Sequence, residues 1–350
     1  MAARMSVADL VVRAARTGEG RAVASLWREL WDAHEAWGGY TGSKDLRVYD
    51  QLAARLEEDA RVRGGHPILG RHIHLVAALG NELTGQVEGW FERHGVDVST
   101  PNTCEVRSLI VAETARKGGS GRALLDTLAR SASTLSRGGT TVLAAEVLEP
   151  NPAHTFYTRV GYAPIAWSTR ITVDDATIRT SGKSGFTARI AEPRDALAVA
   201  MLDATLAARR RASGDVRFDR PRAVDATIVG AIAAHLAHIA ATGADPTEIV
   251  GVDAQGNVRA AGSLAVMALD PPFLPAKRGI LGRFALDPAT DPRLLVPALV
   301  GFAGRLAAAR GALTMELTDL TGPTTPLYRA TTELGARPWS RVVTKLIPAR

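Results

Sequence analysis

The feature that most constrains this chain is a pattern of predicted elements that occurs twice, once on each side of a polar segment. Residues 174–185, DDATIRTSGKSG, show no apolar periodicity and have the composition of a linker. Each flank reads as a strand, two helices, a hairpin, a strand, a helix, a strand, a short helix and a final strand. Tyr157 and Tyr328, in FYTRVGY and LYRATTELGA, lie 171 residues apart at corresponding places. We therefore predict an internal duplication into domains 1–173 and 186–350.

The predicted elements give a mixed α/β chain. In the first half we expect strands at 9–15, 72–79, 83–91, 104–112, 140–148 and 161–173, and helices at 20–37, 45–63, 151–160 and over the segment that carries Leu124, Leu128 and Leu135. In the second half we expect strands at 187–190, 277–286, 312–320 and 339–347, a hairpin at 247–269, and helices at 195–211, 223–241, 293–310 and 325–336.

Composition narrows the class of protein. Hydrophobic residues at 46% and charged residues at 22% are typical of a globular chain. The single cysteine, Cys104, excludes an internal disulfide framework and a multi-cysteine zinc site. The first residues lack the apolar core of a signal peptide, and no run reaches the ~18 consecutive apolar residues of a membrane span. We expect a cytoplasmic protein without a membrane partner.

The positive charge is distributed in a way that argues against nucleic acid as a partner. The net charge is +6, but lysine and arginine are scattered among aspartate and glutamate, and aromatic residues make up only 5%. A scattered positive balance suits anionic small-molecule ligands equally well. The eight histidines lack an acidic third ligand at metal spacing, so we predict no metal site.

A glycine-rich, positively charged loop precedes the helix that carries Leu124. In ARKGGSGRALL, Arg116, Lys117 and Arg122 surround Gly118, Gly119, Ser120 and Gly121. Glycine lets a ligand approach the backbone, and the unpaired N–H groups at a helix N-terminus attract anions. Diphosphate is the natural guest of such a loop. The patterns GxxxxGK[ST] and GxGxxG are both absent, which excludes the two common nucleotide-binding loops.

Two motifs together resemble the GNAT superfamily of N-acyltransferases. The family signature [Q/R]-x-x-G-x-[G/A] is matched by Arg116, Gly119 and Gly121, after the apolar Leu109, Ile110 and Val111. A second family signature is matched by Asn151, Ala153, Phe156, Tyr157, Gly161 and Tyr162. The resemblance covers about residues 8–173. It implies two tandem domains, each with a mixed, mostly antiparallel sheet flanked by helices.

The resemblance also implies how acetyl-CoA binds. Two parallel strands splay apart, and the pantetheine lies between them, bonded by the backbone of Leu109, Ile110 and Val111. The loop from Arg116 through Lys117, Gly118, Gly119, Ser120 and Gly121 to Arg122 holds the pyrophosphate. Asn151 and Tyr157 complete the cofactor set.

The implied reaction is acetyl transfer from a thioester to a primary amine in a ternary complex. A base must free the amine lone pair, and an acid must protonate the leaving thiolate. By resemblance Tyr157 is the acid. Glu105 is our first choice of base, with Glu88 and Glu146 as rivals. By strand alternation Glu105, Arg107 and Leu109 share one face, so Glu105 can instead pair with Arg107.

The acceptor site of the family lies across the first two helices and their connecting loop. We expect Trp37, Tyr40, Glu35 and Glu88 to contact the amine, because aromatic rings with carboxylates suit a cation. Trp27 and Trp31, at i and i+4, are expected in the core instead. An acyl-cysteine route through Cys104 is disfavoured, because no Cys/His pattern accompanies it.

The second half departs from the family pattern at the cofactor loop. Its equivalent, FALDPATDPRLLVPAL at 284–299, has no [Q/R]-x-x-G-x-G and contains aspartates and prolines. We expect this half to support the first domain, the acceptor pocket or dimerisation. The predicted protein is a monomer or homodimer that acetylates a small-molecule amine, such as an antibiotic or a secondary-metabolite intermediate. The alternatives are a non-catalytic acyl-CoA sensor or scaffold and an acyl-CoA decarboxylase.

Overall fold

The computed structural model describes residues 10–92, 102–137, 139–174, 185–218 and 221–349. These residues form two compact units. Unit 1 comprises Met1–Ala163, Asp270–Leu274 and Val343–Arg350, and unit 2 comprises Pro164–Leu269 and Pro275–Val342. Of the predicted linker at 174–185, residues 175–184 lie outside the described part of the chain.

Unit 1 is built on a sheet with the strand order β1-β3-β4-β5-β6, and β2 pairs with β3. All these pairs are antiparallel except β5 with β6, which is parallel. The strands are β1 (Leu10–Arg13), β2 (Ile68–Leu69), β3 (His72–Leu79), β4 (Glu82–Glu92), β5 (Asn102–Val111) and β6 (Thr141–Leu148). The helices are α1 (Gly20–Ala36), α2 (Leu46–Arg63), α3 (Ser120–Leu135) and α4 (His154–Arg159).

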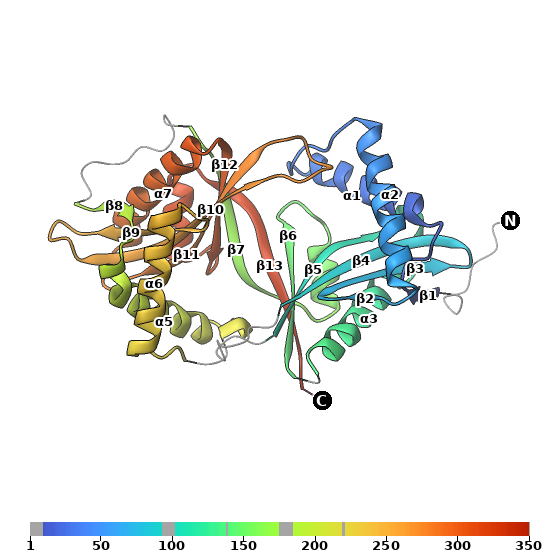
Figure 1. The fold of residues 1–350 in the computed structure, drawn as a ribbon, viewed down its shortest axis with the longest axis horizontal. Coiled ribbons are helices and arrows are strands. Elements are labelled where there is room, and N and C mark those ends of the chain that lie inside the picture. The colour runs from blue at the N-terminus through green and yellow to red at the C-terminus, as the bar shows by residue number, and fades with distance from the viewer. Residues whose placement is uncertain (1–9, 93–101, 138, 175–184, 219–220, 350) are drawn as a thin grey trace. The chain divides into compact units, whose positions relative to one another are not determined.

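The two faces of this sheet are covered by different helices (Figure 1). On one face α1 and α2 pack around Trp31, which is 2% exposed, and the partly buried Trp27 joins the same cluster, as predicted. On the other face α3 buries Leu124 and Leu128 against β3, β4 and β5. Local signals set the helix ends: Asp45 caps the start of α2 through the Arg47 amide, and Gly64, at a φ of 56°, ends it.

Unit 2 repeats this architecture with the strand order β7-β12-β11-β10-β9-β8 and with β13 beside β7. Only β11 with β12 is parallel among the pairs β7–β12, β12–β11, β11–β10, β10–β9 and β9–β8. The strands are β7 (Ala163–Thr172), β8 (Thr187–Ile190), β9 (Thr247–Val252), β10 (Val258–Ala268), β11 (Lys277–Leu286), β12 (Ala312–Leu320) and the part of β13 (Arg337–Ile347) that precedes Val343. The helices are α5 (Ala196–Ala212), α6 (Ala226–Thr242), α7 (Pro292–Ala309) and α8 (Pro326–Glu333). The predicted mixed, mostly antiparallel sheets flanked by helices are confirmed.

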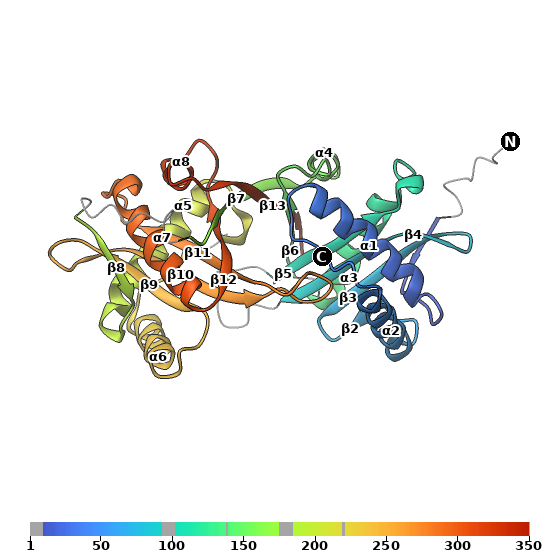
Figure 2. The same cartoon turned by 90° about the horizontal axis from the view of Figure 1, so that it is seen from above.

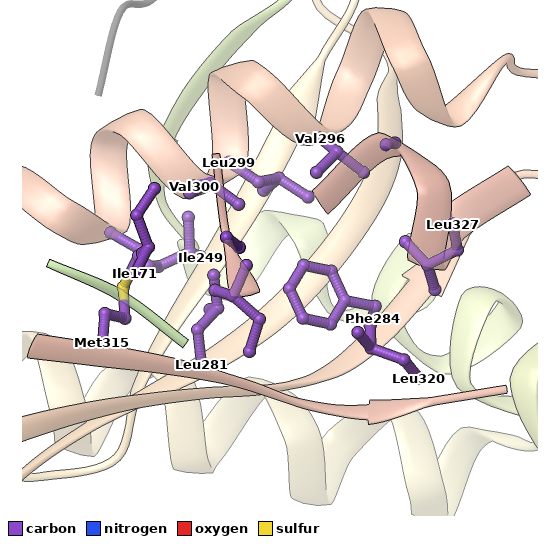
Figure 3. Close-up of a cluster of buried hydrophobic side chains, with 14 of the residues drawn as sticks. Ile171, Ile249, Leu281, Phe284, Val296, Leu299, Val300, Met315, Leu320 and Leu327 are labelled. Atoms are coloured by element: carbon purple, nitrogen blue, oxygen red, sulfur yellow. The ribbon is translucent and has the colours of Figure 1, made fainter. Parts of the chain in front are cut away.

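The core of unit 2 is centred on α7, which lies on the opposite side of the strands from α6 (Figure 2). Val296, Leu299 and Val300 of this helix lie in one buried cluster with Leu281 and Phe284 of β11 (Figure 3). The helix α7 has the length and composition of a membrane span, but more than half of it is buried inside the fold. Its apolar character is that of a core helix.

The compact units differ from the predicted domains in three places. Strand β7 belongs to unit 2, where Ile171 pairs with Met315 of β12. The hairpin tip Asp270–Leu274 and the last residues, Val343–Arg350, belong to unit 1. In each case pairing and packing between residues distant in sequence decide the membership, and such pairing leaves no mark in local composition.

Candidate functional site

The first element of the candidate site is the point at which the two parallel strands of unit 1 stop pairing. Partners run from Asn102↔Thr141 to Val106↔Ala145, and β5 continues to Val111. Ser108 has a positive φ of 53°, an uncommon conformation for a residue other than glycine. The strands therefore part after Val106, as the resemblance implies for a pantetheine site.

The backbone irregularity at Ser108 corrects one prediction. Simple alternation puts Leu109 on the face of Glu105 and Arg107, but Leu109 packs against the core cluster that contains Cys104 and Val106. The positive φ at Ser108 interrupts the alternation of side chains, so the residues after it change face.

The glycine-rich loop connects β5 to α3 in the way an anion site requires. Lys117 and Gly119 have positive φ values of 72° and 89°, and Gly119 precedes the first residue of α3. A Cβ at Gly121 would stand 3.2 Å from Phe156 Cζ and 3.4 Å from Val111 Cγ2, so only glycine fits without displacement. The first-turn N–H groups of α3 have no earlier helical carbonyl to bond. This loop fits a pyrophosphate.

The charged and polar residues of this loop lie as follows. Arg116 donates from Nε to the Val111 carbonyl at 3.2 Å and pairs with Glu29 of α1 at 3.0 Å. Arg122 is exposed, with Asp126 at 3.6 Å. Ser120 is buried beside Thr84, and Gly118 donates its N–H to the Ala115 carbonyl at 3.3 Å. Ile110 is buried, and Val111 is half-buried at the foot of the loop.

The second motif places Tyr157 in the core beside this loop. Asn151 accepts the Ala153 N–H at 2.9 Å and so shapes the turn that begins α4. Phe156 and Tyr162 meet the Tyr157 ring edge-on, at centroid distances of 5.5 and 5.2 Å. Burial raises the pKa of Tyr157 above its usual range, so the phenol is protonated at neutral pH.

The structure places Glu105 on the surface. Its side chain is 46% exposed and accepts from Arg107 at 2.6 Å. This is the ion pair that strand alternation offered as the alternative role of Glu105.

Glu88 is more deeply placed than Glu105. Its side chain is 13% exposed, and its residue on β4 pairs with Arg107, immediately before the irregular Ser108 of β5. Burial raises the pKa of the Glu88 carboxyl to about 7. A carboxyl with this pKa can accept a proton near neutral pH.

A chain of polar side chains that sequence reasoning missed lies behind Glu88. Arg63 is almost wholly buried. It donates from Nε to Asp59 at 2.7 Å and from Nη2 to His72 Nδ1 at 2.6 Å. His72 Nε2 lies 3.8 Å from Glu88 Oε1. The i, i+4 spacing of Asp59 and Arg63 was visible in the sequence, but nothing in the sequence indicated that this pair reaches β3.

The predicted acceptor residues lie at the end of α1 and just beyond it. Glu35 is paired with Lys44 at 2.9 Å. The Trp37 ring lies 5.6 Å from the His34 ring at a tilt of 45°, and Tyr40 meets Phe273 edge-on at 5.9 Å. Phe273 belongs to the hairpin tip that joins unit 1. A pocket of about 520 Å³ is lined by Arg28, Asp32, Glu35, Ala36, Ser43, Lys44 and Tyr49.

Cysteine and metal chemistry find little support in the described residues. Cys104 is fully buried, and burial raises the pKa of its thiol to about 12, so it is an inert packing residue. Within the described ranges, no three histidine, cysteine, aspartate or glutamate residues are placed to hold a metal ion.

The second unit retains the parted strands without the anion loop. Strands β11 and β12 pair up to Leu281↔Leu317, and Arg283 has a positive φ of 54°, as Ser108 has in unit 1. The helix α7 that follows begins with Pro292, after Asp291, whose carboxylate accepts the Arg293 N–H. A carboxylate thus occupies the helix end that a pyrophosphate would need.

Comparisons with known proteins agree with this geometry. Residues 24–162 match the model of the acetyltransferase (GNAT) family, which confirms the resemblance read from the two motifs. This is a family of acyltransferases that use acyl-CoA. Among curated proteins, the sequence comparison found no match.

Solved structures show the same tandem fold. A tandem GNAT protein from the clavulanic acid biosynthesis pathway is 17% identical, with a TM-score of 0.50, over 97% of this chain and 98% of its own. A GCN5-related N-acetyltransferase from Sphaerobacter thermophilus is 17% identical, with a TM-score of 0.54, over 97% and 96%. At these identities the likeness concerns the fold.

Proposed function

We propose that the protein is an acetyl-CoA-dependent N-acetyltransferase whose first unit does the chemistry, because residues 24–162 match the model of the acetyltransferase (GNAT) family. The observation that carries the proposal is the parting of β5 from β6 beside a glycine loop at the N-terminus of α3. The acceptor is a small-molecule primary amine, and transfer is direct, in a ternary complex. We propose that the enzyme works in the cytoplasm as a monomer or homodimer.

Bound acetyl-CoA supplies the acetyl group as a thioester. The N–H groups at the start of α3, with Arg116, Lys117 and Arg122, hold the pyrophosphate. Gly121 keeps the loop close to Phe156, so the loop and the helix that carries Tyr157 form one supported surface.

We assign the general base to Glu88 rather than to our first choice, Glu105. Glu105 is 46% exposed and already accepts a hydrogen bond from Arg107 at 2.6 Å. Glu88 is mostly buried, has a raised pKa of about 7 and lies beside the point where β5 leaves β6. It takes the proton from the ammonium form of the acceptor, directly or through water.

Tyr157 serves as the acid. Its buried phenol stays protonated at neutral pH, and it donates the proton that the leaving sulfur needs. Asn151 supports this role by shaping the turn before α4.

The acceptor amine is bound by the end of α1 and the loop after it. The pocket offers the Tyr49 ring and the carboxylates of Asp32 and Glu35, in a lining that also contains Arg28 and Lys44. Trp37 and Tyr40 are not among the lining residues but follow α1 directly in the sequence. A lining with both signs of charge suits an amine that also carries polar or anionic groups. Antibiotics and secondary-metabolite intermediates with a primary amine are the class we propose.

A thiol-release assay with acetyl-CoA and a panel of aminoglycosides, peptide antibiotics, amino sugars and polyamines tests the proposal. We expect release with at least one amine, a loss of at least tenfold in kcat for Tyr157→Phe, and a larger loss for Glu88→Gln. Glu105→Gln is the matched control and should keep near-wild-type kcat. Binding of acetyl-CoA without release on any amine would favour a sensor or scaffold, and CO₂ release without an amine would favour a decarboxylase.

A further inference from the structure

His72 is a mostly buried side chain, 17% exposed, to which the proposed mechanism assigns no role. It lies on β3, opposite Trp90 of β4, and its ring stacks on the Trp90 ring at a centroid distance of 4.5 Å. The imidazole is therefore held in one plane, with its two nitrogens directed at different neighbours.

One of these neighbours determines which nitrogen carries the proton. The Nη2 atom of Arg63 lies 2.6 Å from His72 Nδ1. A guanidinium has donors only, so Nδ1 must accept and cannot bear a hydrogen. In the neutral ring the proton is then on Nε2. Asp59 accepts from Arg63 Nε at 2.7 Å, which fixes the guanidinium in turn.

The Nε2–H directed by this arrangement points to the region of Glu88. Nε2 is buried and has no hydrogen-bond partner in the part of the chain that the structure describes. Glu88 Oε1 is 3.8 Å away. That separation is longer than a hydrogen bond, so the Glu88 carboxylate has to approach Nε2 by about 1 Å to accept one.

We propose that His72 is a positioning residue for Glu88: its Nε2–H, directed by Arg63 and Asp59, donates to the Glu88 carboxylate and holds it ready to accept a proton from the amine. The inference rests on the proposed role of Glu88 as the base. A buried N–H that bonds the charged form of a carboxyl favours that form, and so opposes the effect of burial.

The charged groups around Glu88 act on its pKa in both directions, so a hydrogen bond from His72 can add to their effect. From α2, Arg55 and Arg63 favour the carboxylate and Asp59 disfavours it; from β5, Arg107 favours it. His74, also on β3, is occupied with Gln86 at 3.1 Å. His72 itself is neutral at working pH, since burial and the nearby Arg63 lower the pKa of its ring to about 4. It acts as a donor and does not take the proton.

Three substitutions separate the donor from the rest of the side chain. His72→Gln places an N–H₂ where Nε2 stands, His72→Asn places its polar atoms only where Nδ1 stands, and His72→Phe keeps the ring alone. His66→Gln, on an exposed histidine of the same segment, is the control.

The readout is the titration of Glu88, followed by carboxyl ¹³C NMR on glutamate-labelled protein and assigned with Glu88→Gln. We expect His72→Phe and His72→Asn to raise the pKa of Glu88 by about one unit, and His72→Gln and His66→Gln to leave it within a few tenths. With an acceptor in hand, the acidic limb of kcat/KM should move by the same amounts. Identical Glu88 titrations in wild type and His72→Phe would overturn the inference.

A second measurement needs no variant of His72 to fold. In ¹⁵N spectra of the wild-type protein, His72 should show a protonated Nε2 and an unprotonated Nδ1. A proton on Nδ1 would also overturn the inference. If Glu88→Gln acetylates amines at the wild-type rate, the proposed role of Glu88 as the base is refuted, whatever the titrations show. If Glu88→Gln is inactive but Glu88 titrates in His72→Phe as it does in the wild type, only the proposed role of His72 is refuted.

Discussion

Replacing Gly119 by aspartate should weaken acetyl-CoA binding through charge alone. Gly119 is exposed, has a φ of 89°, and no atom lies within 4 Å of the place where its Cβ would stand. A new side chain there meets no neighbour, so the cost to the fold is that of the left-handed backbone. Asparagine shares the shape of aspartate and tolerates the same conformation. The ratio of Kd between Gly119→Asp and Gly119→Asn therefore measures the charge.

The magnitude follows from Coulomb's law. Unit charges about 4 Å apart repel by about 1 kcal/mol in bulk water and by about 4 kcal/mol at the effective dielectric of a protein surface. Because Gly119 is exposed, we take a value of about 2 kcal/mol, which corresponds to a roughly thirtyfold ratio of Kd. Raising the salt concentration should shrink that ratio, because the Debye length falls to about 3 Å at about 1 M.

The assay is isothermal titration calorimetry with acetyl-CoA at low and high salt, with thermal unfolding of each variant as a check on the fold. Gly230→Asp is the matched control, because Gly230 lies on α6 and no atom stands within 4 Å of the place that its Cβ would take. It should bind as wild type. Equal Kd values for Gly119→Asp and Gly119→Asn would refute the placement of the pyrophosphate at this loop.

Four further predictions concern three groups with little exposure, Glu88, Cys104 and Phe284. In the folded state the pKa of Glu88 is about 7 against an ordinary 4.5. Its protonated form therefore stabilises the fold below pH 4.5, and that stability is lost as pH rises through 7. In urea titrations, Glu88→Gln should raise the free energy of unfolding by up to about 3 kcal/mol at about pH 8 and change it little at about pH 4. For the same reason kcat/KM of the wild type should rise with pH through about 7, and a flat profile would count against Glu88. Cys104→Ala should keep kcat while costing about 1 kcal/mol of stability, and the native thiol should resist thiol reagents; loss of kcat in a folded variant would revive the acyl-cysteine route. Phe284→Ala should cost about 3–5 kcal/mol in the core of unit 2, and a smaller loss by calorimetry would mean that the cluster in Figure 3 relaxes around the cavity.

The local structure of the chain could be read from the sequence because short-range interactions determine it. Strands β11 and β12 were predicted with the bounds that the structure shows, since apolar runs between glycine and proline signals define them. The sequence also predicted a glycine-rich turn before α3, and the structure has positive φ values at Lys117 and Gly119 there; that this turn holds a pyrophosphate stays a prediction. The burial of Trp31 followed from helical spacing alone.

The tertiary structure decided which of several similar side chains have unusual chemistry. Glu88 and Glu105 are both strand glutamates, and alternation could not rank them. Glu88 is mostly buried and lies close to Arg55, Asp59 and Arg63 of α2, whereas Glu105 is 46% exposed and pairs with Arg107 two residues away. Solvent exposure and neighbouring charge set a pKa, and both come from elements that lie far apart in the sequence.

The sequence distance between interacting residues explains which features of this protein could be predicted from the sequence and which could not. Helix caps, strand periods and a glycine loop depend on residues within a few positions of one another, so the sequence by itself determined most of the elements, their repetition in the two halves and the position of the proposed anion loop. The contact of Arg63 with His72, the side-chain slip at Ser108 and the membership of Phe273 in unit 1 depend on how strands and helices pack. Only the folded chain brings these groups together. The raised pKa of Glu88, the proposed base, likewise comes from burial by other elements.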